Sequence, residues 1–321
     1  MKQGKSDDRI NTEVDKGRRK SAGWPVCFEY RLANGTATVI LPGKKIQKNA
    51  RKMDPWGLAF FDYCRKEAVT PPSRLEFDIT GPLPKNSLPK VEALKRRLSY
   101  LNWGKQVNIT FIVVGSSQPL YSRKELLERP PNEIIRTDFA KRDVNDQPGR
   151  LEKDFQAYLF GKGKSDDTVH TNERLAILGD DFRDLNKKKD TFVMEREFPT
   201  GVFKNKISRY TRILPTEFID VVSFNKRGEL ALIELKVNDS SLQVIAQSLD
   251  YALFFFSYRK QLWKLLEAKL KHRPKKKKIV LYVANNSFHP RFDGVAKYYS
   301  PSDKGVTFEI KKVVLGHTLL I

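Results

Sequence analysis

The chain has 321 residues and a formal net charge of +22, with 40% hydrophobic and 11% aromatic residues. This composition supports a folded core and excludes wholesale disorder, and the length is sufficient for two domains. The two cysteines and four histidines show no zinc-site spacing, and the sequence contains neither a secretory signal nor an apolar run long enough to span a membrane. We therefore expect a soluble cytoplasmic protein with no membrane partner.

The basic excess is spread along the chain. Residues 1–150 contain 29 Lys and Arg against 17 Asp and Glu, a balance of +12, and the remaining residues carry +10. Such a distribution indicates a polyanionic partner, and nucleic acid is the simplest candidate. An ordinary soluble basic surface would have the same composition, so composition alone leaves both interpretations open.

The first half of the chain predicts an arm followed by a small domain. Residues 1–22 are charged without apolar periodicity, which predicts a disordered basic arm. Alternating residues on either side of Ala33-Asn34-Gly35 predict a β-hairpin, and Asp54 and Pro55 are typical of a helix start. The following pattern predicts a helix, a strand, a helix and a strand, at residues 54–68, 74–82, 88–103 and 106–116. We expect an α+β domain over residues 23–148, binding nucleic acid or a partner and ending in a polar linker that contains prolines.

The helix at 88–103 carries three consecutive basic residues, Lys95, Arg96 and Arg97. They are candidates for contacts with DNA phosphates, with an ordinary solvated helix face as the alternative.

A second domain is expected over residues 149–321. Its pattern predicts two helices, a strand, a β-hairpin, a long helical region with a break near Ser257, and two further strands. The corresponding ranges are 150–161, 171–185, 191–201, 218–237, 240–273, 275–286 and 306–315. This order predicts an α/β fold with a mixed central sheet flanked by helices.

The hairpin at 218–237 contains three charged residues within apolar runs: Asp220, Glu234 and Lys236. Residues two apart on a strand share a face, so Glu234 and Lys236 point the same way, and Asp220 falls within about one residue of the position opposite Glu234. Two carboxylates and an ammonium group would then converge near one end of the hairpin.

Buried carboxylates are costly unless they are paired or bind metal. The three groups could form a structural ion pair. Alternatively, Asp220 and Glu234 could hold Mg²⁺, for which Mn²⁺ is expected to substitute, while Lys236 orients or deprotonates water and offsets charge on a phosphate. A phosphodiester is the substrate for which this set makes chemical sense.

The pattern of Asp220 followed by Glu234-Leu235-Lys236 resembles the PD-(D/E)XK, or restriction-endonuclease-like, nuclease superfamily. The proline that often precedes the aspartate in that superfamily is replaced here by Ile219. The order of segments over residues 149–290 is also similar to the nuclease domains of archaeal-type mismatch and branched-DNA endonucleases, which carry a separate N-terminal DNA-binding domain. The resemblance implies a restriction-endonuclease-like core and metal-dependent cleavage of DNA, with endonuclease action expected over exonuclease action.

The resemblance also implies further site residues. A helix after the motif often carries Gln-x-x-x-Tyr, matched here by Gln247 and Tyr251, although Tyr251 could equally be a core tyrosine. An acid from a preceding helix is expected, and Glu152 and Glu173 compete for that place, with an exposed helix acid as the alternative for each.

Two other basic segments are candidates for DNA contacts. Residues 203–212 precede the Asp220 strand and supply Lys204, Lys206, Arg209 and Arg212. The run 271–278 includes Lys275 and Lys276, which could follow a DNA backbone or protect a sheet edge.

Three functions remain open: a Mg²⁺-dependent nuclease in repair or antiphage defence, a non-catalytic nucleic-acid-binding component of a repair or defence complex, and a structural protein. DNA is the expected partner, RNA is the alternative, and a second copy of the chain or an accessory protein subunit is a further candidate.

Overall fold

The computed structural model describes residues 5–19, 23–104, 106–136, 151–160, 170–184, 192–271, 278–300 and 308–316. The chain forms two compact units of mixed α/β structure. The first unit comprises Met1–Glu128, Ile245–Gln247 and Pro290–Pro301, and the second comprises Arg129–Val244, Ser248–His289 and Ser302–Ile321.

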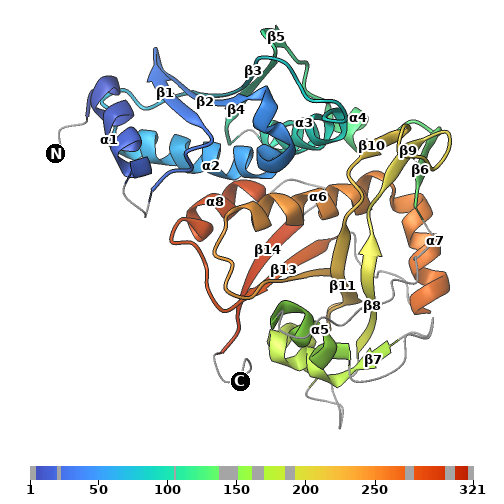
Figure 1. Ribbon diagram of the computed structural model, residues 1–321. Helices are drawn as coiled ribbons and strands as arrows, with labels where there is room; N and C mark the ends of the chain where they lie inside the picture. The colour runs from blue at the N-terminus through green and yellow to red at the C-terminus, as the bar shows by residue number, and fades with distance from the viewer. Residues whose placement is uncertain are drawn as a thin grey trace. The chain divides into compact units, whose positions relative to one another are not determined.

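The first unit is built on a five-stranded sheet in the order β1-β2-β3-β4-β5 (Figure 1). Strands β2, β3 and β4 are parallel, and the edge strands β1 and β5 are antiparallel to their neighbours. The strands are β1 (Glu29–Ala33), β2 (Thr36–Pro42), β3 (Arg74–Thr80), β4 (Asn108–Val113) and β5 (Ser116–Ser117). Burial alternates along β1, β2 and β3, as expected for a sheet with one covered face.

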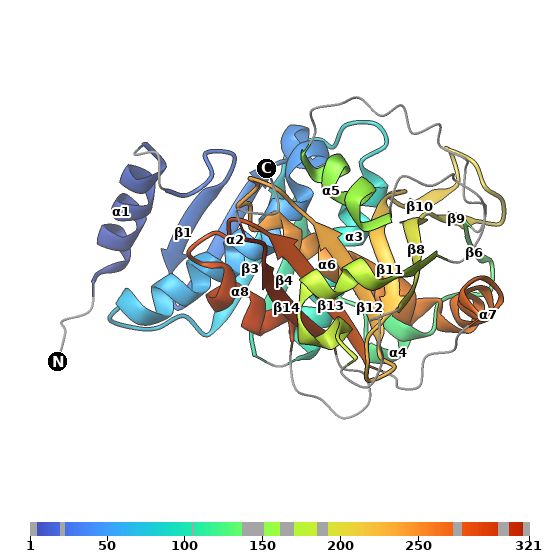
Figure 2. The ribbon, with the colours of Figure 1, turned by 90° about the horizontal axis from the view of Figure 1, so that it is seen from below.

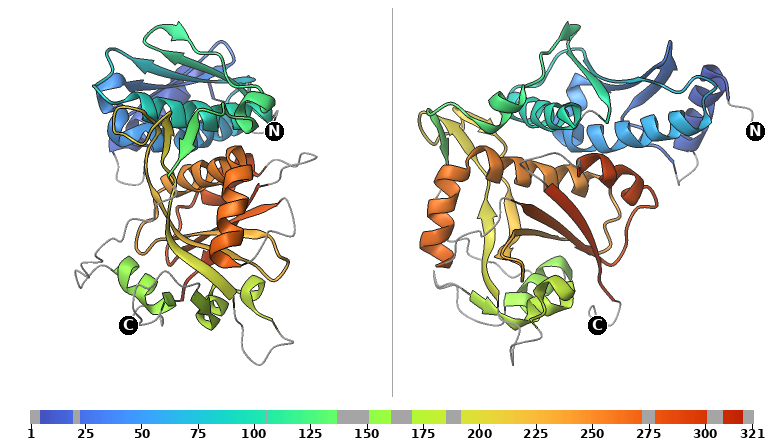
Figure 3. Two further views of the ribbon diagram at one scale, coloured as in Figure 1. Left: turned by 90° about the vertical axis from the view of Figure 1, so that its right-hand side faces the viewer. Right: turned by 180° about the vertical axis from the view of Figure 1, so that it is seen from behind.

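Helices α2 and α3 cover that face of the sheet (Figures 1 and 3). Helix α8, although it comes late in the chain, packs against α2. The helices of this unit are α1 (Asp7–Arg19), α2 (Ile46–Glu67), α3 (Leu88–Trp103), α4 (Arg123–Leu127) and α8 (Phe292–Tyr299), with a 3-10 turn η1 (Gly43–Lys45).

Helix α1 occupies part of the predicted disordered arm, so that prediction was wrong for residues 7–19. Ile10 and Val14, one helical turn apart, are both fully buried, and α1 packs against β1. Burying these two side chains stabilises a segment whose sequence is otherwise polar. The rest of the predicted arm, residues 1–4 and 20–22, lies outside the described residues.

Helix α2 begins well before the predicted start at Asp54 and Pro55. The Asp54 carboxylate is buried and accepts hydrogen bonds from Arg97 Nε (3.0 Å), Arg97 Nη2 (2.9 Å) and the Tyr299 hydroxyl (2.6 Å). Asp54 is therefore used as an ion-pair partner inside the unit and not as a helix cap. Pro55 lies in the helix interior, where it lacks the backbone N–H that a regular turn would use.

The second unit is built on a six-stranded mixed sheet in the order β14-β13-β12-β11-β8-β7. Strands β12, β13 and β14 are parallel, whereas β11 is antiparallel to both β12 and β8, and β7 is antiparallel to β8. The strands are β7 (His170–Asn172), β8 (Phe192–Pro199), β11 (Phe218–Phe224), β12 (Leu230–Leu235), β13 (Ile279–Asn285) and β14 (Phe308–Val314).

The central strands of this sheet are covered on both faces, since every residue of β12 and β13 is buried. One face packs against α5 (Leu151–Phe160) and the 3-10 turns η2 (Glu173–Leu178) and η3 (Asp180–Phe182). The other face lies beneath α6 (Gln243–Ser257), which is followed by α7 (Arg259–Leu270) (Figures 1 and 2). The predicted mixed sheet flanked by helices is confirmed.

A smaller antiparallel sheet in the order β10-β9-β6 extends the second unit. Its strands are β6 (Glu133–Ile135), β9 (Val202–Lys204) and β10 (Arg212–Leu214). Because β6 pairs with β9, the second unit begins at Arg129, earlier than the predicted boundary at residue 148. The polar linker was predicted over residues 117–148, but α4 and β6 lie within its first part, and residues 137–148 lie outside the described residues.

The predicted helix at 171–185 is instead a short strand followed by η2 and η3. Gly179 separates the two turns and has a φ of +108°, a backbone conformation that L side chains rarely adopt. The apolar spacing of the segment is satisfied by burying Leu175, Leu178 and Phe182 in the core beneath the sheet.

Candidate active site

Asp220 and Glu234 occupy neighbouring antiparallel strands, β11 and β12. The pairing of the two strands ends at Val221 and Ile233, and Asp220 and Glu234 are the next residues beyond that pair, at the same end of the hairpin. Residues opposite each other in an antiparallel pair point to the same face. The exposed fraction is 9% for Asp220 and 3% for Glu234, so two buried carboxylates share one end of the hairpin.

Both carboxylate oxygens of Asp220 accept hydrogen bonds. Gln156 on α5 donates from Nε2 to Oδ1 at 2.6 Å, and the backbone N–H of Leu235 donates to Oδ2 at 2.7 Å. One donor comes from a helix and the other from the adjacent strand. These two contacts fix the orientation of the carboxylate and favour its ionised form.

Lys236, immediately after β12, joins the acids. Its Nζ lies 2.7 Å from Glu234 Oε1 and 3.3 Å from Glu152 Oε1, and it donates to the Leu235 carbonyl at 3.0 Å. The backbone N–H of Lys236 donates to the carbonyl of Ala284 on β13 at 2.8 Å, which fixes the residue at the end of β12. Lys236 therefore bridges an acid from the sheet and an acid from α5.

The electrostatics of this group are unusual for buried residues. Burial, followed by the nearby charge of Glu234, raises the pKa of Asp220 well above its ordinary value. Burial alone would lower the pKa of Lys236, but the carboxylates of Glu234, Asp220 and Glu152 outweigh it and raise that pKa. Three carboxylates and one ammonium leave two negative charges in excess when all four groups are ionised.

An excess of two negative charges and a pair of buried carboxylates fit a hard divalent cation. Mg²⁺ is held by one or two carboxylates and keeps several of its waters, so Asp220 and Glu234 suffice as its protein ligands. The described part of the chain contains no group of three or more His, Cys, Asp or Glu side chains placed to hold a metal ion. The donor set is therefore unsuited to a structural zinc ion, which takes four protein ligands.

Of the two competing helix acids, the structure brings Glu152 to the site and not Glu173. Glu152 lies on α5 within reach of Lys236, whereas Glu173 is exposed at the start of η2. Sequence periodicity could not separate the two, because both follow the same local pattern of an acid near the start of an apolar segment.

The two residues of the predicted Gln-x-x-x-Tyr pattern lie on α6. The Tyr251 ring is buried and its hydroxyl donates to the carbonyl of Phe218 at 2.9 Å, two residues before Asp220. Tyr251 therefore attaches α6 to the start of β11, as a core tyrosine would. Gln247 is half-buried one turn earlier, and the side-chain amide that the structure places on Asp220 is that of Gln156.

Sequence reasoning missed Gln156. The residue follows Glu152 by one helical turn, and the spacing alone places both on one face of α5. That spacing was the available signal, but a glutamine on an amphipathic helix is ordinarily solvated, and only the packing of α5 against the sheet reveals its contact.

Two predicted phosphate contacts are wrong. Arg96 and Arg97 are 2% and 1% exposed, so neither guanidinium is available to DNA. Arg97 is committed to Asp54, and Arg96 Nε donates to Glu92 at 2.9 Å. Lys95 is half-buried, with its Nζ 4.4 Å from the ring centroid of Tyr121. The run of three cations looked like a solvated face because the sequence does not show that α2 and α4 lie on either side of α3.

The other predicted phosphate contacts have different outcomes. Lys204, Lys206, Arg209 and Arg212 are all exposed on the hairpin formed by β9 and β10. Lys275 and Lys276 lie outside the described residues.

Among the described residues, no helix combines the length and the apolar character that crossing a membrane requires. Comparisons of the chain with protein-family models, with curated proteins and with solved structures found no match.

Proposed function

We propose that the chain is a metal-dependent deoxyribonuclease that hydrolyses phosphodiester bonds and that its second unit is a restriction-endonuclease-like core. The observation that carries the proposal is the buried pair of Asp220 and Glu234, in which the pKa of Asp220 is strongly raised and Glu234 Oε1 lies 2.7 Å from Lys236 Nζ. A like-charged buried pair is unfavourable in a purely structural role and is typical of catalytic sites.

The sequence of elements supports the same proposal. Helix α5 precedes the sheet and supplies Glu152 and Gln156, the β11–β12 hairpin supplies the acids and Lys236, and α6 returns the chain so that β13 lies parallel to β12. This order agrees with the expectation drawn from the PD-(D/E)XK resemblance.

In this proposal Asp220 and Glu234 hold Mg²⁺ at the end of the hairpin. When bound, Mg²⁺ polarises the scissile phosphate and lowers the pKa of its water. Gln156 and the Leu235 N–H keep the Asp220 carboxylate in one orientation. Lys236 has a raised pKa and is therefore a cation at neutral pH, so we assign it to stabilising negative charge on the phosphate rather than to removing a proton.

A second candidate is a non-catalytic component that binds nucleic acid. The formal charge of +22 favours it equally, because charge recruits a polyanion whether or not cleavage follows. The two candidates differ in their dependence on the Asp220–Glu234 pair, which binding alone does not require.

The test is a cleavage assay on labelled single-stranded, duplex and branched DNA, and on RNA, with Mg²⁺, Mn²⁺ or EDTA. We expect divalent-dependent cleavage that falls by roughly 10²–10³-fold or more in Glu234→Gln and Lys236→Ala. The matched control is Glu309→Gln on β14, a half-exposed carboxylate paired with Lys278, which should cut at the parent rate. Equal cleavage by Glu234→Gln would show the site assignment to be wrong, and absence of cleavage by the parent on every substrate would favour the binding component.

A further inference from the structure

The hairpin formed by β9 and β10 has a composition unlike the rest of the second unit. Residues 203–212, here called the basic hairpin, contain four Lys or Arg residues in ten and no acid. All four cations are exposed, namely Lys204, Lys206, Arg209 and Arg212. The hairpin therefore presents a local charge of +4 with no carboxylate of its own to compensate it.

The tip of the basic hairpin also exposes apolar surface. Tyr210 is 78% exposed and Ile207 is 52% exposed, and the two are three residues apart in the chain. The guanidinium of Arg209 lies 4.5 Å from the ring centroid of Tyr210 and donates to its hydroxyl. With most of its surface in solvent, the phenol ring retains area against which another flat group could stack.

The tip is an ordered turn and not a loose loop. The backbone N–H of Lys204 donates to the carbonyl of Thr211 at 2.8 Å, and the Thr211 hydroxyl donates to the carbonyl of Lys206 at 2.5 Å. The N–H of Asn205 donates to the carbonyl of Asn132, next to β6, at 2.8 Å. Tyr210 is therefore presented from a fixed backbone, which reduces the entropy that binding would cost.

The basic hairpin joins the end of β8 to the start of β11, two neighbouring strands of the large sheet that carries Asp220. Pro199 at the end of β8 pairs with Phe218 at the start of β11, and Asp220 is two residues further along. Strand β9 follows β8 directly, and β10 leads into β11. A strand of nucleic acid held by the hairpin would therefore approach the sheet from the end where the carboxylates lie.

We propose that the basic hairpin is a base-stacking site that binds nucleic acid with unpaired bases. The inference deepens the proposed function and rests on it for the polyanionic ligand. Four cations without a compensating acid would contact the phosphates, and the ring of Tyr210 would stack on a base. Bases within an intact duplex are stacked on both faces by their neighbours, so the ring has a partner in single strands, flaps and junctions rather than in continuous duplex.

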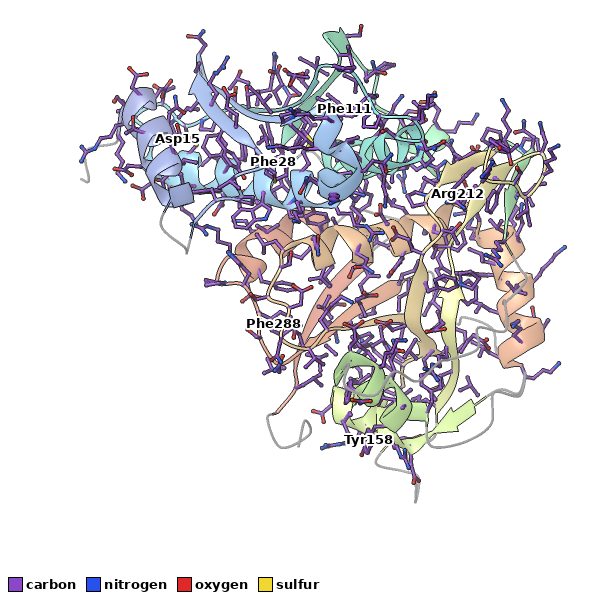
Figure 4. The ribbon with its side chains drawn as sticks, viewed as in Figure 1. Asp15, Phe28, Phe111, Tyr158, Arg212 and Phe288 are labelled. Atoms are coloured by element: carbon purple, nitrogen blue, oxygen red, sulfur yellow. The ribbon has the colours of Figure 1, made fainter. Side chains whose placement is uncertain are left out.

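A second exposed tyrosine gives an internal contrast. Tyr158 on α5 is 46% exposed, and the guanidinium of Arg174 lies 5.0 Å from its ring centroid. It shares the tyrosine–arginine pairing of Tyr210, but α5 carries the exposed acid Asp154. Figure 4 shows Tyr158 at the opposite end of the second unit from Arg212 of the basic hairpin. A carboxylate-bearing surface repels phosphates, so Tyr158 is the matched residue where stacking on nucleic acid is not expected.

The experiment measures binding in EDTA, so that it does not depend on cleavage. Fluorescence anisotropy of labelled oligothymidylate of about 15 nucleotides and of a duplex of about 30 base pairs is compared for the full chain and its variants. Tyr210→Ala should weaken single-strand binding by about tenfold or more and leave duplex binding within about twofold of the parent. Tyr210→Phe should retain the affinity of the parent, and Tyr158→Ala should leave the affinity for both DNA ligands unchanged.

A charge variant completes the design. The double variant Lys204→Gln, Lys206→Gln should bind both single-stranded and duplex DNA more weakly, with a reduced salt dependence, because both ligands carry phosphates. Because the Tyr210 side chain is 78% exposed, its removal leaves the core intact, and equal melting temperatures of parent and variant would show that a loss of binding does not come from misfolding.

The outcomes separate this inference from the proposed nuclease function. If Tyr210→Ala binds single strands as tightly as the parent, or loses the same affinity for single strands and for duplex, the base-stacking proposal is wrong. That conclusion holds even when the protein shows metal-dependent cleavage. If binding depends on Tyr210 but no substrate is cleaved under any metal, the hairpin site stands and the nuclease proposal is the one that fails. Equal loss in Tyr158→Ala would also contradict a site specific to the basic hairpin.

Discussion

The two ends of the β11–β12 hairpin both bury carboxylates, but in opposite electrostatic settings. At the turn, Asp181 of η3 accepts hydrogen bonds from Arg227 at 2.7 Å, Tyr282 at 2.7 Å and Lys311 at 2.5 Å. Glu229 accepts from Arg227 and from Asn225, each at 2.8 Å. At this end the carboxylates of Asp181 and Glu229 form ion pairs with Arg227 and Lys311, and each of these contacts is favourable.

The pKa values follow from these contacts. Burial alone would raise the pKa of Asp181, but hydrogen bonds from Lys311, Tyr282 and Arg227 outweigh it and lower the pKa to about 2. At the other end, burial and the charge of Glu234 act together and raise the pKa of Asp220. The partly buried Asp181 is therefore stabilised as an anion, whereas the buried Asp220 is destabilised as an anion.

This contrast separates a structural carboxylate from a functional one. The Asp181 contacts join the hairpin turn to η3, β13 and β14, and they account for the burial without any ligand. The Asp220 carboxylate is well oriented, but the nearby charge of Lys236 does not outweigh its burial and the charge of Glu234, and an additional positive charge would stabilise the anion. Buried acids kept in such a state mark candidate catalytic sites.

The first test of this comparison is Gln156→Ala, for which we expect a large loss of divalent-metal affinity. Gln156 is a positioning residue, because it acts through Asp220 and reaches neither the substrate nor the reacting atoms in the proposed mechanism. Losing its hydrogen bond should weaken divalent-metal affinity by about 10–100-fold, as for other groups that orient a metal ligand. Cleavage measured against metal concentration should show a raised half-saturation point and a rate near that of the parent at saturating metal.

The control for that experiment is Gln261→Ala, an exposed glutamine on α7. It should leave the metal dependence unchanged. A purely structural role for Gln156 would lower the melting temperature of the variant and leave its half-saturating metal concentration where it is in the parent.

The sequence predicted the hairpin acids and Lys236 because their positions follow from the two-residue period of a strand. It could not choose between Glu152 and Glu173, nor find Gln156, because these depend on which helix packs beneath the sheet. Likewise, Arg97 and Asp54 are far apart in sequence, and only the tertiary packing of α2 against α3 turns a predicted helix cap and a predicted phosphate contact into one ion pair. Local periodicity therefore predicted the longer strands and the helices α2, α3, α5, α6 and α7, but not the short strands β6, β7, β9 and β10. The partners of charged side chains required the fold.

An effect of similar size, on stability instead of metal binding, is expected at the other end of the hairpin, from Asp181→Asn. The variant loses charge-assisted hydrogen bonds to Arg227 and Lys311, which should cost about 1–3 kcal/mol in the free energy of unfolding at neutral pH. Because the pKa of Asp181 is lowered from 3.8 to about 2, its contribution is fully present above pH 3.8 and is lost as pH falls toward 2. Urea unfolding of parent and variant should therefore differ at pH 7 and converge near the acid end of that range.

The neighbouring Asp180 supplies the control for the turn. Its side chain is largely exposed, and its contact with Arg183 is long, at 3.7 Å. Asp180→Asn should change stability by less than about 0.5 kcal/mol. Both variants should retain parent cleavage, and loss of cleavage in a folded Asp181→Asn protein would show that the turn is part of the site after all.

The smallest effect, and the one with the opposite sign, is expected from Asp220→Asn in the absence of metal. The replacement removes the cost of holding an ionisable carboxyl in a buried position beside Glu234, and should raise the free energy of unfolding by about 1 kcal/mol at neutral pH, or the melting temperature by about 2 °C. The backbone N–H of Leu235 can still donate to the amide oxygen, and the Gln156 amide can rotate to accept from the new NH₂ group.

The pH dependence of stability shows why Asp220→Asn should stabilise the metal-free protein. Since the folded protein holds the Asp220 proton more tightly than the unfolded chain, this residue makes the metal-free parent less stable as pH rises from the ordinary carboxyl pKa through the raised one. Asp220→Asn should remove that slope and also the rise in melting temperature on adding Mg²⁺, which in the parent should grow with pH as the proton is displaced. A variant that is less stable than the parent, with its pH slope unchanged, would place Asp220 in the same class as Asp181. The two ends of the hairpin would then both be structural, and the nuclease proposal would lose the observation on which it rests.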